Sequence, residues 1–202
     1  VGLLQLIVLT RLLLPGDFGL MAASAAVLLA IQMFSELGLE PAVIAKPNVT
    51  DEDLRVAWTL SVIRGFLLTL GLWGLADVIA GSLRIPELGF FLRVHAAGVL
   101  LQSLHSPALF VLLKQLDLRR RVSFDLSRRL VESAVTIGLA WWWQSAWALL
   151  GGQLVAFLFG SLLSFWVAPC RIRWSLDRTA LQSLWSYGRY QNVTAWFLFT
   201  VM

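Results

Sequence analysis

TRLLLPGDFGLMAASAAVLLAIQMFSELGLEPAVIA, residues 10–45, is the stretch that decides the fold. After a turn at Pro15-Gly16-Asp17 it continues as one long apolar segment, and a segment of that length can cross a bilayer as a helix. Three polar residues interrupt it at intervals of four, namely Gln32, Glu36 and Glu40. On one continuous helix they would form a single polar line, which should face protein or water because lipid does not satisfy polar groups.

The composition of the whole chain is that of a membrane protein. Of its 202 residues, 58% are apolar and 14% are charged, and the mean hydropathy is +0.77, whereas soluble domains have about 45–50% apolar and about 25% charged residues. Ten tryptophans fit the same interpretation, since indole rings favour the interface between membrane and water. The net charge of +4 comes from basic residues in the loops between apolar segments, which argues against a nucleic-acid partner.

Apolar segments separated by short polar turns predict an all-α polytopic membrane protein, a six-helix transmembrane bundle followed by the start of a seventh span. We expect the bundle in residues 1–174, an amphipathic connector in 175–189 and the beginning of the seventh span in 190–202. Because the first and last segments are cut short, we expect the chain to be a fragment. Pro107 is expected to kink the fourth span. The six predicted spans are 1–14, 18–44, 54–83, 88–113, 122–143 and 147–168.

Lysine and arginine are distributed unequally between the two sets of alternate loops. One set, with the adjoining helix ends, holds only Arg11, Arg84 and Arg93. Cytoplasmic loops are rich in basic residues, so we expect the other set, and with it the N-terminus, to lie in the cytoplasm. That set holds Lys46, Arg55, Lys114, Arg119, Arg120, Arg121, Arg128, Arg129, Arg171, Arg173 and Arg178.

Two stripes of small residues predict close helix packing. In each stripe the small residues recur every four positions, which lets helix backbones approach closely in a membrane. An alternative is that some of them line a cavity or slide past a neighbouring helix during a conformational change. The stripes are Ala22, Ala26 and Ala30 in the second span, and Gly152, Ala156, Gly160 and Ser164 in the sixth.

Glu36 and Arg64 are predicted to form an ion pair. They lie fourteen residues before and after Thr50, which is near the middle of the loop between the second and third spans. Antiparallel neighbours would bring them to a similar depth, and an unpaired charge inside the bilayer costs about 3 kcal/mol or more. The pair either has a structural role, which we favour, or acts as a gate or ligand contact in a water-filled cavity.

A second polar line lies in the fourth span. Its members share one helix face, because their spacings are three, four and seven. Two histidines in a transport helix can relay protons; we favour instead hydrogen bonds to neighbouring helices or the lining of an aqueous cavity. The residues are His95, Gln102, His105 and Ser106.

The fifth span begins with a mixed-charge segment that contains Asp125, Arg128, Arg129 and Glu132. Its offsets of three and four allow local ion pairs, so the segment is either a self-neutralising helix end or a cationic cavity entrance suited to phosphate. Elsewhere the sequence has no Gly-rich phosphate loop with a lysine, no metal-spaced His/Cys cluster and no GxSxG motif. We therefore expect no enzyme activity, no metal and no cofactor.

Several motifs, in the same order along the chain, resemble those of one family. RLLLPGDFGL (11–20) and FSELGLEPA (34–42) resemble the RLLxPxDFGL and FSDLGLxxA segments of bacterial polysaccharide transporters. PALFVLLKQLDLRRR (107–121), WALLGGQLV (147–155) and the basic connector 168–187 continue the match. These transporters are the oligosaccharide flippases of the multidrug/oligosaccharidyl-lipid/polysaccharide (MOP) exporter superfamily. The charge at Gly188-Arg189 departs from the family, which usually continues apolar there.

The resemblance implies half of a MATE-like two-bundle transporter in the bacterial inner membrane. Such proteins flip lipid-linked oligosaccharide, usually carried on undecaprenyl pyrophosphate, for synthesis of lipopolysaccharide or exopolysaccharide, alongside a polysaccharide polymerase and other glycan assembly proteins. A cationic cavity is expected to hold the substrate. Carried over to this chain, the candidates are Arg64 and Arg129 for the anion, with Glu36, Gln102 and His105 as further lining residues.

Two alternatives remain open. A cation-coupled multidrug or small-molecule exporter of the same superfamily would use acidic residues such as Glu36 for its cations. A membrane scaffold of a glycan assembly complex would transport nothing.

Overall fold

The computed structural model describes residues 2–35, 38–170, 174, 175, 177, 178 and 180–182, and within these ranges every regular element is a helix. The all-α fold is therefore confirmed. The predicted seventh span, 190–202, lies outside the described residues. In chain order the helices are α1 (Gly2–Leu12), α2 (Pro15–Phe34), α3 (Leu39–Ala45), α4 (Asp51–Leu83), α5 (Glu87–Ser103), α6 (Ala108–Lys114), α7 (Leu118–Trp143) and α8 (Ala146–Val167).

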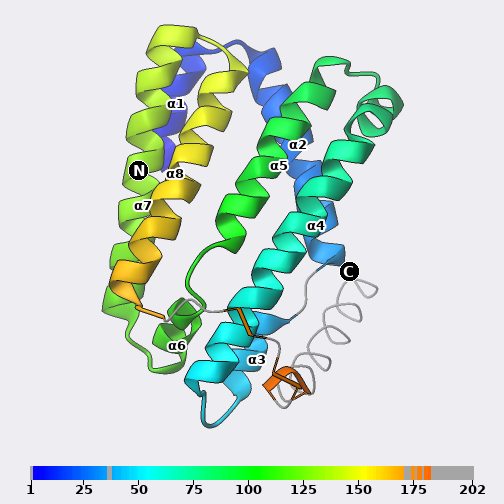
Figure 1. Ribbon diagram of the computed structural model, residues 1–202. Helices are drawn as coiled ribbons and strands as arrows, with labels where there is room; N and C mark the ends of the chain where they lie inside the picture. The colour runs from blue at the N-terminus through cyan, green and yellow to red at the C-terminus, as the bar shows by residue number, and fades with distance from the viewer. Residues whose placement is uncertain (1, 36–37, 171–173, 176, 179, 183–202) are drawn as a thin grey trace, which may run out of the picture.

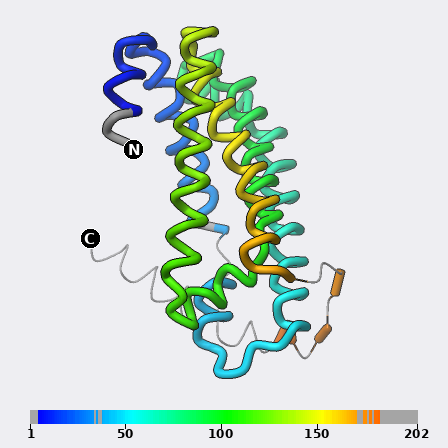
Figure 2. Tube along the Cα trace, turned by 90° about the vertical axis from the view of Figure 1, so that its left-hand side faces the viewer, coloured from blue at the N-terminus to red at the C-terminus, as the bar shows by residue number. Residues whose placement is uncertain are grey.

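Two antiparallel helix pairs, α4 with α5 and α7 with α8, form the body of the fold (Figure 1). Helices α5 and α8 contact each other and join the pairs, while α1 packs along α7 and α2 packs against both α5 and α8. The short helices α3 and α6 contact each other at one end of the bundle. The turns α1–α2, α4–α5 and α7–α8 lie at the other end (Figures 1 and 2), so the loops alternate between the two ends as the sequence predicts.

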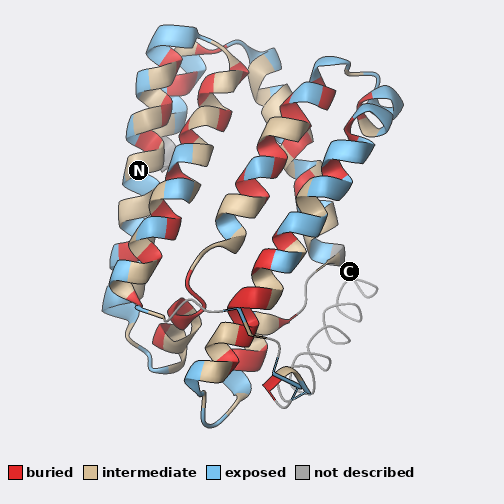
Figure 3. Ribbon diagram, in the orientation of Figure 1, coloured by how far each residue is buried: buried red, intermediate tan, exposed pale blue. Residues whose placement is uncertain are grey.

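Apolar residues cover the outside of the bundle as well as its inside. Figure 3 shows buried residues mostly where helices face one another and many exposed residues on their outer sides. Leu67 and Trp73 of α4 and Trp166 of α8 are all more than half exposed. Large apolar side chains on the outer surface of long helices are expected of a protein whose solvent is lipid.

Three helices of the described residues are long and apolar enough to cross a membrane: α2, α4 and α8. The bent pair α5 and α6 makes a fourth candidate if the two helices are counted as one span. Helix α7 is not among them, because seven charged residues lie in its first fifteen positions. Helix α1, at 11 residues, is too short to qualify.

Asp17 joins the starts of two helices at the end of the bundle opposite α3 and α6. Its Oδ2 accepts a hydrogen bond from the backbone N–H of Leu14 at 3.0 Å, and its Oδ1 accepts one from the N–H of Ala146 at 2.8 Å. A carboxylate is well placed there, because the first N–H groups of a helix have no partner within the helix and carry positive partial charge. Asp17 thus caps α2 and also holds the first residue of α8.

The second predicted span is broken. We expected one helix through 18–44 with Gln32, Glu36 and Glu40 in a line; instead α2 ends at Phe34 and α3 begins at Leu39. The physical reason is Gly38, which adopts the left-handed conformation with φ 61°, a conformation that glycine takes at little cost and that ends helical geometry. The polar line on one continuous helix is therefore wrong. Gln32 is on α2 and Glu40 on α3, and Glu36 lies outside the described residues.

The kink predicted at Pro107 is confirmed. Helices α5 and α6 meet at an angle of 62°, and Pro107 immediately precedes α6. Ser106, at the break, forms hydrogen bonds with the end of α8 and the residue after it. Its N–H donates to Ser164 Oγ at 2.9 Å, and its hydroxyl donates to the carbonyl of Ala168 at 2.7 Å. Irregular backbone at membrane depth needs such partners within the protein.

The two small-residue stripes have opposite surroundings. Gly152, Ala156, Gly160 and Ser164 are buried on α8. A Cβ added at Gly152 would lie 1.9 Å from Thr136 Oγ1 of α7, so the backbones of α7 and α8 approach as closely as the spacing predicts. Ala22, Ala26 and Ala30 are exposed on α2, so they make no close helix contact within the described part of the chain. The inner face of α2 instead carries Ser24 and Leu28.

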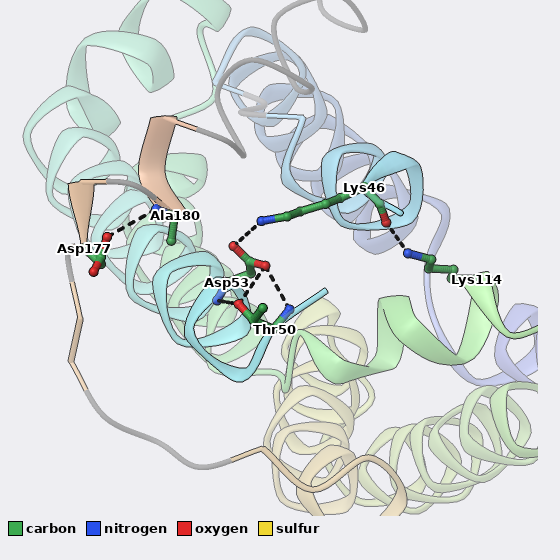
Figure 4. A network of polar contacts seen from close by, with 6 residues as sticks. All are labelled: Lys46, Thr50, Asp53, Lys114, Asp177 and Ala180. Atoms are coloured by element: carbon green, nitrogen blue, oxygen red, sulfur yellow. Dashed lines mark hydrogen bonds and ion pairs between the residues drawn. The ribbon is translucent and has the colours of Figure 1, made fainter. Parts of the chain in front are cut away.

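A polar network closes the end of the bundle where α3 and α6 lie (Figure 4). Asp53 is 1% exposed, accepts hydrogen bonds from the N–H and hydroxyl of Thr50, and pairs with Lys46 Nζ at 2.7 Å. Lys114 at the end of α6 donates to the carbonyls of Lys46 and Pro47. The network therefore caps α4 and ties the α3–α4 loop to α6.

The predicted connector is described only in part. Ala180 is buried against the cluster formed by Ala42, Val43, Val56 and Ala57 of α3 and α4, and Leu181 packs beside it. The remaining residues of 175–189 that would test its amphipathic pattern lie largely outside the described residues.

Candidate functional site

Two adjoining cavities lie between the helix pairs. The first has a volume of about 500 Å³ and is lined by residues of α1, α2, α5, α7 and α8. The second has a volume of about 430 Å³ and is lined mainly by α2–α7, towards the end of the bundle where α3 and α6 lie. Their walls share residues from four helices, so the cavities are direct neighbours. The shared residues are Gln32, Val99, Gln102, Arg128 and Phe157.

The predicted site residues that the structure describes all line these cavities. Gln102 lines both, Arg64 and His105 line the second, and Arg129 lines the first. Glu36, the fifth candidate, lies outside the described residues, and so does its predicted ion pair with Arg64. The broken α5–α6 segment carries Gln102 and His105 at the junction between its two helices.

Arg64 reaches from α4 to the end of α2. Its Nη2 donates to the carbonyl of Gln32 at 3.1 Å and to Ser35 Oγ at 3.2 Å, and its Nε donates to the same hydroxyl at 3.3 Å. A cation suits this place, because the last carbonyls of a helix are unsatisfied and carry negative partial charge. Arg64 therefore positions the end of α2 where the chain turns into α3.

Most of the arginines of α7 that face the cavities have a carboxylate close by. Arg128 lies 3.6 Å from Glu132 and Arg121 lies 3.2 Å from Asp125, which are the local pairs that the sequence spacing allowed. Arg129 is exposed and has no ion pair among the described residues. It is the lining arginine whose charge is least compensated.

Arg128 was not among the residues that the family resemblance singled out, yet it lines both cavities. Its side chain passes over Gly160 of α8, where an added Cβ would lie 3.1 Å from Arg128 Cδ, and its guanidinium carbon is 5.9 Å from the centre of the Phe157 ring. The small residue on α8 thus leaves the space that Arg128 occupies. The sequence contains both parts of this contact, a charged helix face in the fifth predicted span and a glycine in the sixth, and together they could have indicated where Arg128 lies.

The two histidines of α5 and the α5–α6 break have different surroundings. His95 is 2% exposed and shares a hydrogen bond of 2.7 Å with Ser24 of α2, with Gln153 of α8 as its other polar neighbour. His105 shares a hydrogen bond of 2.6 Å with the carbonyl of Gln102 and meets the edge of the Phe124 ring. His95 thus makes a hydrogen bond to a neighbouring helix and also lines the first cavity, which are the two roles that we favoured over a proton relay.

Within the described residues, no three His, Cys, Asp or Glu side chains are grouped so that they could hold a metal ion. The two cavities offer hydrogen-bonding side chains, a few partly compensated charges and the aromatic rings of Phe110, Phe124 and Phe157. Such a set binds and orients a polar molecule.

The family model of a polysaccharide biosynthesis protein matches residues 8–202. The chain belongs to this family. The resemblance to bacterial polysaccharide transporters that the sequence motifs suggested is thereby confirmed.

Curated relatives of this polysaccharide biosynthesis chain have names that refer to transport or to surface glycans. The chain is 24% identical over 194 residues to the succinoglycan biosynthesis transport protein ExoT of Rhizobium meliloti. The aligned residues are 95% of this chain and 39% of the relative. The chain is 22% identical over 154 residues to the lipopolysaccharide biosynthesis protein WzxC of Escherichia coli, covering 76% and 31%.

A third relative, an uncharacterised membrane protein in the cps region of Klebsiella pneumoniae, is 30% identical over 95 residues, which are 47% of this chain and 20% of the relative. The chain thus spans less than two fifths of the length of each of these relatives. No solved structure matches it.

Proposed function

We propose that the protein is a transporter that flips lipid-linked oligosaccharide, carried on undecaprenyl pyrophosphate, from the cytoplasmic to the outer leaflet of the inner membrane. The observation that carries the proposal is a pair of adjoining cavities, lined by polar and charged side chains, inside a bundle whose outer surface is apolar, in a member of the polysaccharide biosynthesis family. A polar headgroup cannot cross lipid at a useful rate, and cavities of this kind offer it a hydrated path.

In this proposal Arg129 contacts the pyrophosphate. Its guanidinium lines the larger cavity without an ion pair among the described residues, and a guanidinium holds phosphate oxygens through paired donors. Arg64, Gln102 and His105 line the path beyond it. Glu36 belongs to the same proposal as the partner of Arg64.

The end of the bundle with α3 and α6 faces the cytoplasm in this proposal, and so does the N-terminus. The support is the excess of lysine and arginine in the loops at that end. Reporter fusions at Lys46 and Arg84 test it: a fusion active only in the periplasm should work at Arg84 and fail at Lys46, and the reverse pattern overturns the orientation. The polysaccharide polymerase and other glycan assembly proteins are the proposed partners.

Deleting the gene tests the function. The deletion strain should accumulate lipid-linked oligosaccharide on the cytoplasmic side of the membrane and lose surface polysaccharide, and the restored gene should reverse both effects. If the deletion instead raises sensitivity to toxic cations or drugs while surface polysaccharide is unchanged, the exporter alternative is favoured. Loss of surface polysaccharide without accumulation of lipid-linked oligosaccharide on the cytoplasmic side of the membrane would favour the scaffold alternative.

A pair of matched variants then tests the site. Arg129→Gln should lower the rate of surface polysaccharide synthesis by about 10- to 150-fold, the effect of one lost charge-assisted hydrogen bond. Arg119→Gln removes the same charge from an exposed position on the same helix that lines neither cavity, and should leave the rate unchanged. Equal effects of the two variants would contradict the role of Arg129.

A further inference from the structure

Four glutamines line the larger cavity, and each comes from a different helix. They are Gln5 of α1, Gln32 of α2, Gln102 of α5 and Gln153 of α8. Intramembrane glutamines are unfavourable facing lipid, and here all four face the same space. The topology has brought together one amide side chain from each helix around it except α7, which contributes Arg128, Arg129, Glu132 and Ser133.

The side-chain amides of the four glutamines differ in how they are bonded to the part of the chain that the structure describes. Gln5 Oε1 accepts a hydrogen bond of 2.7 Å from Ser133, and Gln153 lies beside His95. By contrast, the side-chain amides of Gln32 and Gln102 form no hydrogen bond with any described residue, although the Gln32 carbonyl is used by Arg64 and the Gln102 carbonyl by His105. Gln102 is also exposed. Their donors and acceptors are therefore available to a molecule in the cavity.

The charge of the two cavities is nearly balanced among the described residues. Positive lining residues are Arg64, Arg121, Arg128 and Arg129, and negative ones are Glu40, Asp125 and Glu132, so four charges oppose three. Arg129 can take an anionic group, but the arginines that are paired with carboxylates leave little further positive charge for one. A molecule rich in uncharged hydroxyl groups matches better, because a hydroxyl both donates and accepts and so does an amide, whereas a guanidinium only donates.

We propose that the glutamines of the larger cavity form a binding subsite for the uncharged hydroxyl groups of the glycan, separate from the contact of Arg129 with the anionic group. This inference rests on the proposed function. It assigns the sugar part of the substrate to the glutamines and the anionic part to Arg129. Gln32 and Gln102 contact the sugar. Gln5 shapes the subsite, because its Oε1 already accepts from Ser133. Gln153 adds an acceptor to it, because its Oε1 is buried with no hydrogen-bond partner among the described residues.

Binding of two lipids by the full gene product, purified in detergent, tests the subsite. One probe is lipid-linked oligosaccharide isolated from the deletion strain, and the other is undecaprenyl pyrophosphate without sugar. Gln32→Leu and Gln102→Leu should each weaken binding of the glycosylated lipid by about 2- to 10-fold, the value of one or two neutral hydrogen bonds. Neither should change the affinity for the sugar-free lipid, whereas Arg129→Gln should weaken binding of both.

Gln115→Leu is the matched control, because Gln115 is exposed and lines neither cavity. Gln102→Asn, which keeps a shorter amide, should bind the glycosylated lipid better than Gln102→Leu. If Gln102 had a purely structural role, the two variants would not differ in affinity for the glycosylated lipid alone. The inference is overturned if the leucine variants weaken both lipids equally or neither. The proposed function fails separately, and visibly, if the unmodified protein binds neither lipid.

Discussion

Gly152 offers the sharpest test of how α7 and α8 pack. An alanine Cβ at this position would lie 1.9 Å from Thr136 Oγ1, 2.8 Å from its Cβ and 2.9 Å from its Cα. The hydroxyl can rotate away, but the Cβ and Cα belong to the framework of α7 and can move only with the helix. Gly152→Ala therefore forces the two helices apart.

The net effect is the difference of two opposing contributions. Alanine in place of glycine favours a helix interior by about 1 kcal/mol, while overpacking a close contact costs about 1–3 kcal/mol and occasionally more. The framework contacts place Gly152→Ala towards the upper part of that range, so we expect a net loss of roughly 1–2 kcal/mol. Gly138→Ala on α7 is the matched control, because an added Cβ there meets nothing within 4 Å, and it should be neutral or slightly stabilising.

Thermal unfolding of the purified protein in detergent measures the difference. For a chain of about this size, 1 kcal/mol corresponds to roughly 2–4 °C in Tm, so Gly152→Ala should unfold several degrees below Gly138→Ala. Thr136→Gly, which removes both the hydroxyl and the Cβ from the contact, should recover part of the loss when combined with Gly152→Ala. If Gly152→Ala is as stable as Gly138→Ala, the close contact between α7 and α8 does not exist and the reasoning is refuted.

Three further perturbations have defined outcomes. Asp17→Ala should lower stability by about 1–3 kcal/mol because two backbone N–H groups lose a charged acceptor, and Asp17→Asn, which keeps one oxygen, should lose less in the same melting assay. Asp53→Ala should cost about 3–5 kcal/mol, the cost of breaking a buried pair, whereas Asp51→Ala, in the same helical turn but exposed, should cost under about 1 kcal/mol. Glu36→Arg and Arg64→Glu should each abolish polysaccharide transport, and the double variant should restore part of it; no recovery would contradict the pairing.

The helices could be predicted from the sequence where the cause of a boundary is local. Pro107 removes a backbone donor, and its ring clashes with the preceding turn, so the kink follows from one residue. The break after α2 also depends on one residue, Gly38, but glycine is common within membrane helices, and nothing in the local pattern indicated that this one adopts a positive φ. The four-residue spacing therefore predicts one helix for Gln32 and Glu40, which belong to two.

The cavity residues could be predicted because charge and polarity are costly in lipid. Arg64, Arg129, Gln102 and His105 were selected as polar residues inside apolar segments that resemble a transporter, and each lines a cavity. Gln5 and Gln153 satisfy the same criterion, since both interrupt apolar segments. The cost of burying charge does not single them out, because they are uncharged, although an uncharged amide suits a hydroxyl-rich molecule better than a cation does.

Packing faces are harder to predict, because periodicity specifies a helix face but not what that face meets. The alanines of α2 and the small residues of α8 have the same four-residue spacing, yet the first set is exposed and the second is buried. The residue that decides which side of α2 faces the protein lies on the opposite side of the helix from the alanines. Ser24 is the one hydroxyl residue between Asp17 and Gln32, and its bond to His95 turns the opposite side of α2 outward. In an apolar solvent, the direction of a helix is set by its few polar side chains, because only they gain much by facing protein.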